Sequence, residues 1–383
     1  MIPIGEELKR RGCQVFWAIP ESTSFGTFLR TLDFELLPVP NFNFSDHPIP
    51  LSQTYGENLL KNGYRKTELL INRLKFWVNH IDQLKPNLVV AEHAPSALLA
   101  AKARGIPVVA TGTGFSIPPL ESPMPSLQPW FSLPKKNLHQ KERYFLETVN
   151  PALLDVGFSQ LTAVSDIFKD VELFLATFPE FDHYEKRTNM QYHGPVVHST
   201  QDNEPRWPSN KGGNVFIYLK PDNRFFIPIL KQIKEMGLPV LAYVPGLPES
   251  ERISLSGKNL QISPFPVNLK DAKSRCCFAI TEGGHNTGVL LILQGVPLLV
   301  CPGQLEQAIW AYRISNRKLG VMIGYFDSAP DFKKKIEEIY TSSNIREGTQ
   351  MLAKKYSNFD SQECIQEISS KCFDLSNDSR KEN

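Results

Sequence analysis

The sequence predicts two α/β domains in tandem, each built around a mainly parallel sheet. At 383 residues the chain is longer than a single hydrophobic core usually organises. Short apolar runs alternate with helix-like segments in two series, which a polar stretch at 193–213, rich in proline, glycine and asparagine, separates. The runs are almost continuously apolar, which is typical of parallel strands covered on both faces.

The first series begins with a helix pattern, PIGEELKRRG, in which Ile4 and Leu8 share a face, and continues with a strand pattern, CQVFWAIP. LKPNLVVAEHAP, SALLAAKARG and IPVVATGTG then predict a strand, a helix and a parallel strand. The proline-rich stretch 115–135 is predicted to be a long surface loop. It is either a binding segment or a loop that packs on its domain through Trp130 and Phe131. VELFLATFPEFD predicts a further strand.

The second series predicts another parallel sheet. Its strand patterns, which alternate with helix patterns, are NVFIYLKP, PVLAYVPG, KNLQISPF, CCFAI, PLLVCPG and GVMI. We therefore expect four parts in the chain: a domain over 1–195, a linker over 196–212, a domain over 213–355, and a C-terminal helix and tail over 356–383.

Composition argues against several classes of function. The 42 Lys and Arg balance 40 Asp and Glu and are dispersed, so a nucleic-acid partner is not indicated. The six cysteines form no C-x-x-C pair, so we expect neither a structural metal nor a disulfide framework. No apolar run is long enough to span a membrane and no export signal precedes the first helix, so we expect a cytoplasmic protein without a membrane span.

One motif of the sequence indicates a binding site for an anion. The strand CCFAI is followed by Gly283 and Gly284 and then by a helix that begins near Asn286 and Thr287. A strand-glycine-helix turn directs free amide groups and the positive end of a helix toward an anion, most naturally a phosphate. His285 and the Thr287 hydroxyl can add hydrogen bonds. A Gly-Gly turn can equally be only a tight connection.

The next strand pattern, PLLVCPG, leads to Glu306 and Gln307, which we expect at the same carboxyl edge of the sheet. TEGGHNT, QGVPLLVCP and EQ together resemble the donor-site signature of nucleotide-sugar glycosyltransferases of the GT-B type, in the macrolide and plant UDP-glycosyltransferase branch. The resemblance covers nearly the whole chain and implies two facing Rossmann-like domains with an interdomain cleft. It implies that Glu306 and Gln307 hold sugar hydroxyls, although Glu306 can instead cap its helix.

The resemblance also implies roles for other positions of the second domain. Gly283, Gly284, Asn286 and Thr287 match positions that bind the diphosphate of the donor. Phe265, in ISPFPVN, resembles the residue of the loop that stacks on the nucleobase, although a core position is the alternative.

Two positions of the second domain depart from the family pattern. Glu282 stands where the family usually has a histidine, and its charge repels phosphate unless the carboxylate points away or is neutralised. His285 is a candidate to replace that histidine. Leu290 stands where the family has a ribose-binding glutamate, so the nucleotide preference stays open.

A third departure concerns the base. In the family, a first strand and a catalytic histidine precede the helix that matches PIGEELKRRG, so the first strand is missing here. We expect a start set too far downstream rather than a true loss, because removing a central strand leaves its neighbours unpaired. Glu92 matches the carboxylate that orients the family's histidine. His93 beside it is either a base or a polar loop residue.

The resemblance therefore predicts a metal-independent, inverting hexosyltransferase. It moves the sugar of a nucleoside-diphosphate donor, its co-substrate, to a hydroxyl of a small, apolar acceptor, and it needs no cofactor. One alternative is a catalytically inactive nucleotide-sugar-binding protein of the same fold, which Glu282, Leu290 and the missing N-terminal histidine would permit. Another is a nucleotide-sugar epimerase, for which no acidic and basic groups around the sugar are identified.

Overall fold

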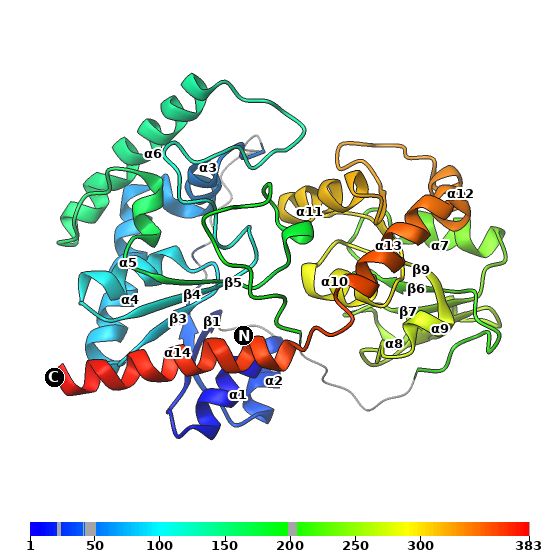
Figure 1. Ribbon diagram of the computed structural model, residues 1–383, viewed down its shortest axis with the longest axis horizontal. Helices are drawn as coiled ribbons and strands as arrows, with labels where there is room; N and C mark the ends of the chain where they lie inside the picture. The colour runs from blue at the N-terminus through cyan, green and yellow to red at the C-terminus, as the bar shows by residue number, and fades with distance from the viewer. Residues whose placement is uncertain (21–23, 41, 43–50, 198–204, 383) are drawn as a thin grey trace. The chain divides into compact units, whose positions relative to one another are not determined.

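The computed structural model describes residues 1–20, 24–40, 42, 51–197 and 205–382 (Figure 1). Its contacts divide the chain into two compact units, each with parallel strands between helices, which confirms the predicted α/β class. Unit 1 comprises Met1–Thr177, Arg187–Val196 and Ser361–Asn383, and unit 2 comprises Phe178–Lys186 and Val197–Asp360.

These units are not continuous in the sequence. Phe178–Lys186 packs within unit 2, although the sequence places it inside an expected domain over 1–195. The C-terminal segment Ser361–Asn383 packs within unit 1. Of the expected linker 196–212, residues 198–204 lie outside the described residues. Local patterns identify helices and strands, but they do not show on which of two similar cores a segment packs.

Unit 1 contains two parallel sheets. β1 (Phe16–Pro20) pairs with β2 (Glu35–Val39) in one of them. The other has the order β3-β4-β5, from β3 (Val89–Ala91), β4 (Val108–Gly112) and β5 (Glu172–Leu175). The helices of unit 1 are α1 (Ile2–Arg10), α2 (Ser24–Thr31), α3 (Tyr55–Leu59), the π-helix Leu60–Tyr64, α4 (Thr67–Leu84), α5 (Pro95–Ala103), α6 (Lys135–Asp155), the 3-10 helix Val164–Phe168 and α14 (Ser361–Glu382).

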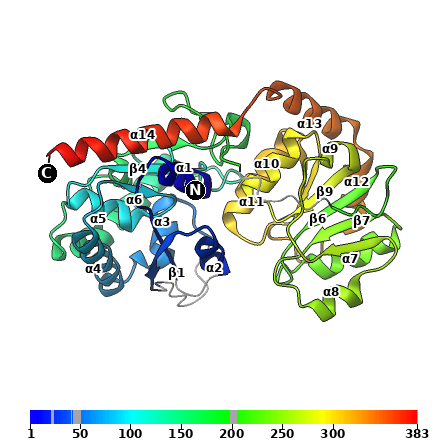
Figure 2. The same cartoon turned by 90° about the horizontal axis from the view of Figure 1, so that it is seen from below.

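Different helices cover the two faces of the β3-β4-β5 sheet. Val108 and Ala110 of β4 pack with α4, α5 and α6. Val109 lies between them in the strand and packs on the opposite face with Ile4 of α1 and Ile368 of α14, because successive strand residues point to opposite sides. α14 lies alongside α1 in Figures 1 and 2. The predicted opening helix is thus confirmed, with its apolar face buried.

The proline-rich stretch 115–135 differs from its prediction. It has no helix or strand before α6 begins, as expected. It is not a simple surface loop, however, because Ile117 and Leu127 are completely buried and Trp130 is half-buried. Leu120 and Phe131 of the same stretch are exposed. Apolar side chains spaced along the stretch fasten it to unit 1.

Unit 2 contains one sheet of six parallel strands, in the order β11-β10-β9-β6-β7-β8. The strands are β6 (Asn214–Tyr218), β7 (Val240–Tyr243), β8 (Leu260–Ser263), β9 (Cys276–Thr281), β10 (Leu298–Val300) and β11 (Gly320–Met322). Its helices are the 3-10 helix Pro179–Phe181, α7 (Phe226–Glu235), α8 (Glu249–Leu255), α9 (Ala272–Arg275), α10 (His285–Leu293), α11 (Leu305–Asn316), α12 (Phe332–Thr341) and α13 (Ser343–Lys355). All six predicted strands are present.

The unit 2 sheet is doubly wound. The chain runs outward from β6 through β7 to β8 and then crosses to the other side of β6 to form β9, β10 and β11. Ile217 and Ile280 pack on the face covered by α7 and α12, and Phe216 and Ala279 pack on the face covered by α10 and α11 (Figure 2). This arrangement is Rossmann-like, and the order of the strands reverses between β6 and β9.

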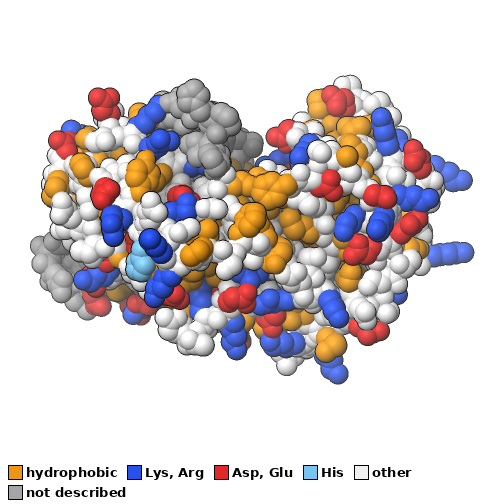
Figure 3. Space-filling model, turned by 90° about the horizontal axis from the view of Figure 1, so that it is seen from above, with side chains coloured by type: hydrophobic (Ala, Val, Ile, Leu, Met, Phe, Trp, Pro, Cys, Tyr) orange, Lys and Arg blue, Asp and Glu red, His pale blue; other side chains and the backbone are white. Residues whose placement is uncertain are grey.

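Charged side chains of both signs are interspersed over the face shown in Figure 3. This mixture of acidic and basic side chains agrees with the net charge of +2. The described residues therefore form no continuous basic area on this face of the kind that binds a nucleic-acid backbone. Within the described part of the chain, no helix combines the length and the apolar character that crossing a bilayer requires.

Candidate functional site

The carboxyl ends of β6, β9 and β10 meet at one edge of the unit 2 sheet. Tyr218, which ends β6, lies opposite Thr281 of β9, and Thr281 lies opposite Val300 of β10. In doubly wound sheets, ligands bind outside the carboxyl ends of the strands where the strand order reverses. The glycine turn identified in the sequence follows β9 and therefore lies at this point.

Position 283 requires glycine, both because of its backbone conformation and because neighbouring atoms leave no room for a side chain. Its φ is +91°, a conformation that favours glycine. A Cβ at this position would lie 2.8 Å from Cγ1 of Val300 and 3.2 Å from the backbone oxygen of Gln307. The amide of Gly283 donates to Oγ1 of Thr281 at 3.2 Å. The absence of a side chain thus lets the start of α10 approach the first turn of α11.

The first turn of α10 presents amide groups without a capping side chain. Gly284 is the N-cap residue, and because it has no side chain it makes no side-chain cap hydrogen bond. Gly284 and Asn286 are exposed, and Thr287 is half-buried. Amides at the start of a helix have no partner within the helix, and the helix dipole adds partial positive charge there. This end of α10 can therefore receive an anion.

Glu306 and Gln307 lie in the first turn of α11 but have different environments. The Gln307 side chain is buried, and its Oε1 accepts a hydrogen bond from the Gly303 amide at 2.9 Å. The Glu306 side chain is 31% exposed, and its Oε2 lies 3.4 Å from Nε2 of Gln304. Gln307 thus shapes the loop after β10, whereas Glu306 presents a carboxylate at the surface.

Glu282 is directed to the loop after β6. Its Oε1 accepts hydrogen bonds from the Lys220 amide at 3.0 Å and from Nδ2 of Asn223 at 3.3 Å. Nδ2 of Asn223 also donates to the backbone oxygen of Cys301 at 3.0 Å, so this buried amide joins the ends of three strands. Burial and then the Glu282 carboxylate raise the pKa of the Cys301 thiol. Sequence reasoning did not identify Asn223, because its partners come from separate loops.

His285 lies inside unit 2. It is 6% exposed, and its ring contacts those of Phe181 and Trp310 with centroid separations of 6.4 and 6.1 Å. Its Nδ1 lies 3.3 Å from Oδ1 of Asn286. Burial lowers the pKa of His285 to about 4, so the ring is neutral at pH 7. The idea that His285 replaces a phosphate-binding histidine gains no support from this packing.

The buried His285 leads to a pH-dependent stability. Its folded-state pKa of about 4 is below its ordinary value of 6.5, so between these pH values only the unfolded chain binds the proton. The folded state therefore has its full stability with respect to this proton above pH 6.5, and it loses stability as the pH falls toward 4. We expect His285 to lower the free energy of unfolding by about 2 kcal/mol between pH 7 and pH 5.

Urea unfolding at the two pH values measures this effect. In His285→Leu, the difference between pH 7 and pH 5 should shrink by that amount. His139→Leu makes the same substitution at an exposed position of α6 and should keep the full difference. An unchanged difference in His285→Leu would contradict the assignment.

Phe265 and Leu290 differ in exposure. Phe265 follows β8 and is 61% exposed, so it is not a core residue. Ser263 Oγ donates to the Phe265 backbone oxygen at 2.6 Å and fixes the loop that carries the ring. Leu290 is half-buried and packs against the core on the α10 side of the sheet. Of the two, Phe265 is the exposed side chain and offers an aromatic surface to solvent.

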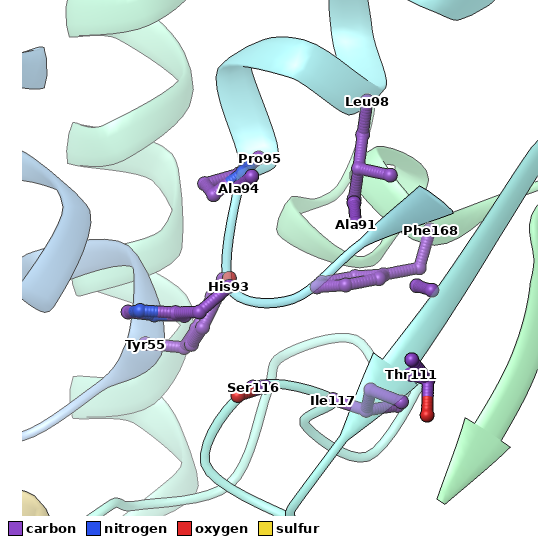
Figure 4. A pocket seen from close by; sticks show the side chains of 11 residues that line it. Tyr55, Ala91, His93, Ala94, Pro95, Leu98, Thr111, Ser116, Ile117 and Phe168 are labelled. Atoms are coloured by element: carbon purple, nitrogen blue, oxygen red, sulfur yellow. The ribbon is translucent and has the colours of Figure 1, made fainter. Parts of the chain in front are cut away.

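A narrow hollow lies at the carboxyl ends of β3 and β4 in unit 1 (Figure 4). Its lining includes Tyr55, His93, Ser116 and Phe168, and the space is too tight for a water molecule. The His93 ring contacts the rings of Tyr55 and Phe115, at centroid separations of 6.1 and 5.3 Å. The surface of His93 is partly exposed to solvent. The surrounding protein nevertheless shields the ring from water, and this desolvation lowers the pKa of His93. A neutral His93 can accept a proton.

Two further charged residues, Glu92 and Arg187, lie near the hollow in unit 1. Glu92 is exposed beside His93, after the end of β3. Arg187 is buried, and its Nη1 donates to the backbone oxygen of Ile117 at 2.7 Å, which holds the loop that carries Ser116. Sequence reasoning missed Arg187, because nothing local relates it to a loop that lies far earlier in the chain.

Comparisons with known proteins agree with this architecture. No family model matches the chain. The PGL/p-HBAD biosynthesis rhamnosyltransferase of Mycobacterium bovis (strain BCG / Pasteur 1173P2) is 23% identical over 314 residues, which cover 75% of this chain and 67% of that protein.

Solved glycosyltransferase structures match almost the whole chain. SsfS6 of Streptomyces sp. SF2575 has a TM-score of 0.63 at 17% identity, covering 96% of this chain and 94% of its own. VinC, in complex with DTDP, has a TM-score of 0.65 at 15% identity, and the match covers 98% of this chain and 96% of VinC. The calicheamicin glycosyltransferase CalG4 has a TM-score of 0.67 at 18% identity, and the match covers 96% of this chain and 93% of CalG4. The chain therefore has the GT-B fold that these glycosyltransferases share.

Proposed function

We propose that this protein is a glycosyltransferase that moves a hexose from a nucleoside-diphosphate donor to a hydroxyl of a small acceptor. The names of its relatives support this, since they include a rhamnosyltransferase and a glycosyltransferase in complex with DTDP. The observation that carries the proposal is the uncapped N-terminus of α10 beside the first turn of α11. It combines amide groups for a diphosphate with the Glu306 carboxylate for sugar hydroxyls.

In this proposal unit 2 holds the donor. The diphosphate accepts hydrogen bonds from the first amides of α10, and Phe265 stacks on the nucleobase. As the bond to the sugar breaks, negative charge grows on the diphosphate, and the helix end stabilises it. Preorganised amides supply the stabilisation that a divalent metal supplies in other phosphate chemistry, so we propose a metal-independent reaction.

Unit 1 holds the acceptor in the same proposal. The acceptor oxygen attacks the anomeric carbon, the bond between that carbon and the diphosphate oxygen breaks, and the diphosphate leaves with the electron pair. The hydroxyl proton passes to a base, for which His93 and Glu92 are the candidates. Attack opposite the leaving group inverts the anomeric carbon. The aromatic rings around His93 favour an apolar acceptor.

A thermal-shift panel tests the proposal. We expect thymidine diphosphate or uridine diphosphate to raise the unfolding temperature, because a ligand at about 100 times its Kd stabilises the folded state by about 2.7 kcal/mol. Inorganic phosphate and the free nucleosides serve as controls and should have smaller effects. If no nucleoside diphosphate shifts the midpoint, the donor site is wrong. Binding of a nucleotide sugar without transfer to any hydroxylated acceptor would instead favour the inactive binding protein.

A further inference from the structure

The segment Phe178–Lys186 is fastened to the helices of unit 2. Phe178 stacks on Tyr356 with ring centroids 3.7 Å apart and an angle of 14° between the rings. Phe181 is completely buried and packs on Trp310 of α11. Aromatic contacts at both positions hold the segment against the side of the sheet that carries α10 and α11.

The same segment brings His183 to the candidate donor site. Arg313 of α11 donates its Nε to the backbone oxygen of His183 at 3.1 Å, and its Nη1 pairs with Glu185. His183 is 1% exposed, and its Nε2 lies 3.7 Å from Oε1 of Glu306. Gln304 approaches the other carboxylate oxygen. The Glu306 carboxylate thus lies between a buried imidazole and an amide.

We propose that His183 is a positioning residue that holds Glu306 in the orientation in which it binds the hydroxyls of the donor sugar. The inference rests on the proposed function and specifies how the same site recognises its sugar. A glutamate with three rotatable bonds loses conformational freedom when it binds a ligand. A buried neighbour that already restricts the carboxylate reduces this cost, and it acts on the sugar contact without touching the diphosphate.

A purely structural role predicts a different result. The His183 ring is nearly parallel to that of His285, with centroids 6.4 Å apart, so it also fills space in unit 2. Loss of packing alone would disturb the start of α10 and weaken the binding of diphosphate and of nucleotide sugar together. Loss of positioning would weaken only the binding of the nucleotide sugar.

Titration calorimetry with two probes separates these roles. Thymidine diphosphate reports on the diphosphate site, and thymidine diphospho-glucose reports on that site together with the sugar contact. In His183→Leu we expect affinity for thymidine diphospho-glucose to fall about three- to tenfold, with affinity for thymidine diphosphate changed less than about twofold. His183→Gln should recover most of the loss, because its terminal amide can donate from nearly the position of Nε2. His139→Leu, on the surface of unit 1, should bind both probes normally.

Each outcome has a definite meaning. An equal loss for both probes, or no loss for either, overturns the positioning role. If His183→Leu does not fold, His183→Asn replaces it, because its shorter side chain stays polar but ends before Glu306, and the same results apply. If the unmodified protein binds neither probe nor any other nucleoside diphosphate, the proposed function fails, and this inference fails with it.

Discussion

Glu306→Gln is expected to weaken the binding of thymidine diphospho-glucose by about tenfold to a hundredfold, because hydrogen bonds to a charged group contribute more than neutral ones. The substitution keeps the shape of the side chain, removes its charge and replaces one acceptor oxygen with an NH2 donor. Thymidine diphosphate lacks the sugar, so its affinity should change little. Titration calorimetry with the two ligands gives the ratio directly.

Glu249→Gln is the matched control for Glu306→Gln. Glu249 also lies in the first turn of a helix, α8, but it is exposed and pairs with Arg252 of the same helix. Both substitutions remove a negative charge near a helix N-terminus, where its effect on stability is about 0.3–1 kcal/mol. Retention of full affinity for thymidine diphospho-glucose by Glu306→Gln would remove Glu306 from the donor site.

Gly288→Val is expected to have the largest effect on stability. A Cβ on Gly288 of α10 would lie 2.2 Å from Cη2 of Trp310, which is completely buried in α11. The two helices must separate to admit a side chain, so we expect a loss of about 3 kcal/mol or more in the free energy of unfolding. Urea unfolding followed by circular dichroism measures the loss.

Gly257→Val is the control for this overpacking. Beyond Gly257 and its two chain neighbours, no heavy atom of the described residues lies within 4 Å of the place where its Cβ would be, and its φ is not in the left-handed region. Both variants introduce the same side chain, so a difference between them reports the contact with Trp310. If Gly288→Val unfolds at the same urea concentration as Gly257→Val, the close packing of α10 on α11 is wrong. Separation of these helices should also abolish the binding of thymidine diphosphate.

Much of the fold follows from local patterns. The helix that contains Ile4 and Leu8 could be predicted because its apolar residues recur with the helical period, and β9 could be predicted because its first five residues are continuously apolar. The turn at Gly283 and Gly284 could be predicted because glycine after a strand and before a helix marks a close approach of the backbone. Each of these features depends on a few neighbouring residues.

The candidate site could be located from the sequence, but the directions of its side chains could not. His285 points into unit 2, and Glu282 points to Lys220 and Asn223. Residues adjacent in a turn can face solvent, core or another loop, and the choice depends on which surfaces the fold brings beside them. The burial of stretch 115–135 has the same origin, because proline content predicts the absence of a helix but not the core on which the stretch packs.

The sequence by itself determined the α/β class, the six strands of unit 2, and the glycine turn that places helix amides at the carboxyl edge of a sheet. Only the tertiary structure decided that Phe178–Lys186 packs on α11, that His183 lies beside Glu306, and that Asn223 joins three strand ends. The physical reason is the range of the interactions. Periodicity and backbone preference act between neighbours in the chain, whereas burial and hydrogen bonding join residues that only the completed fold brings into contact.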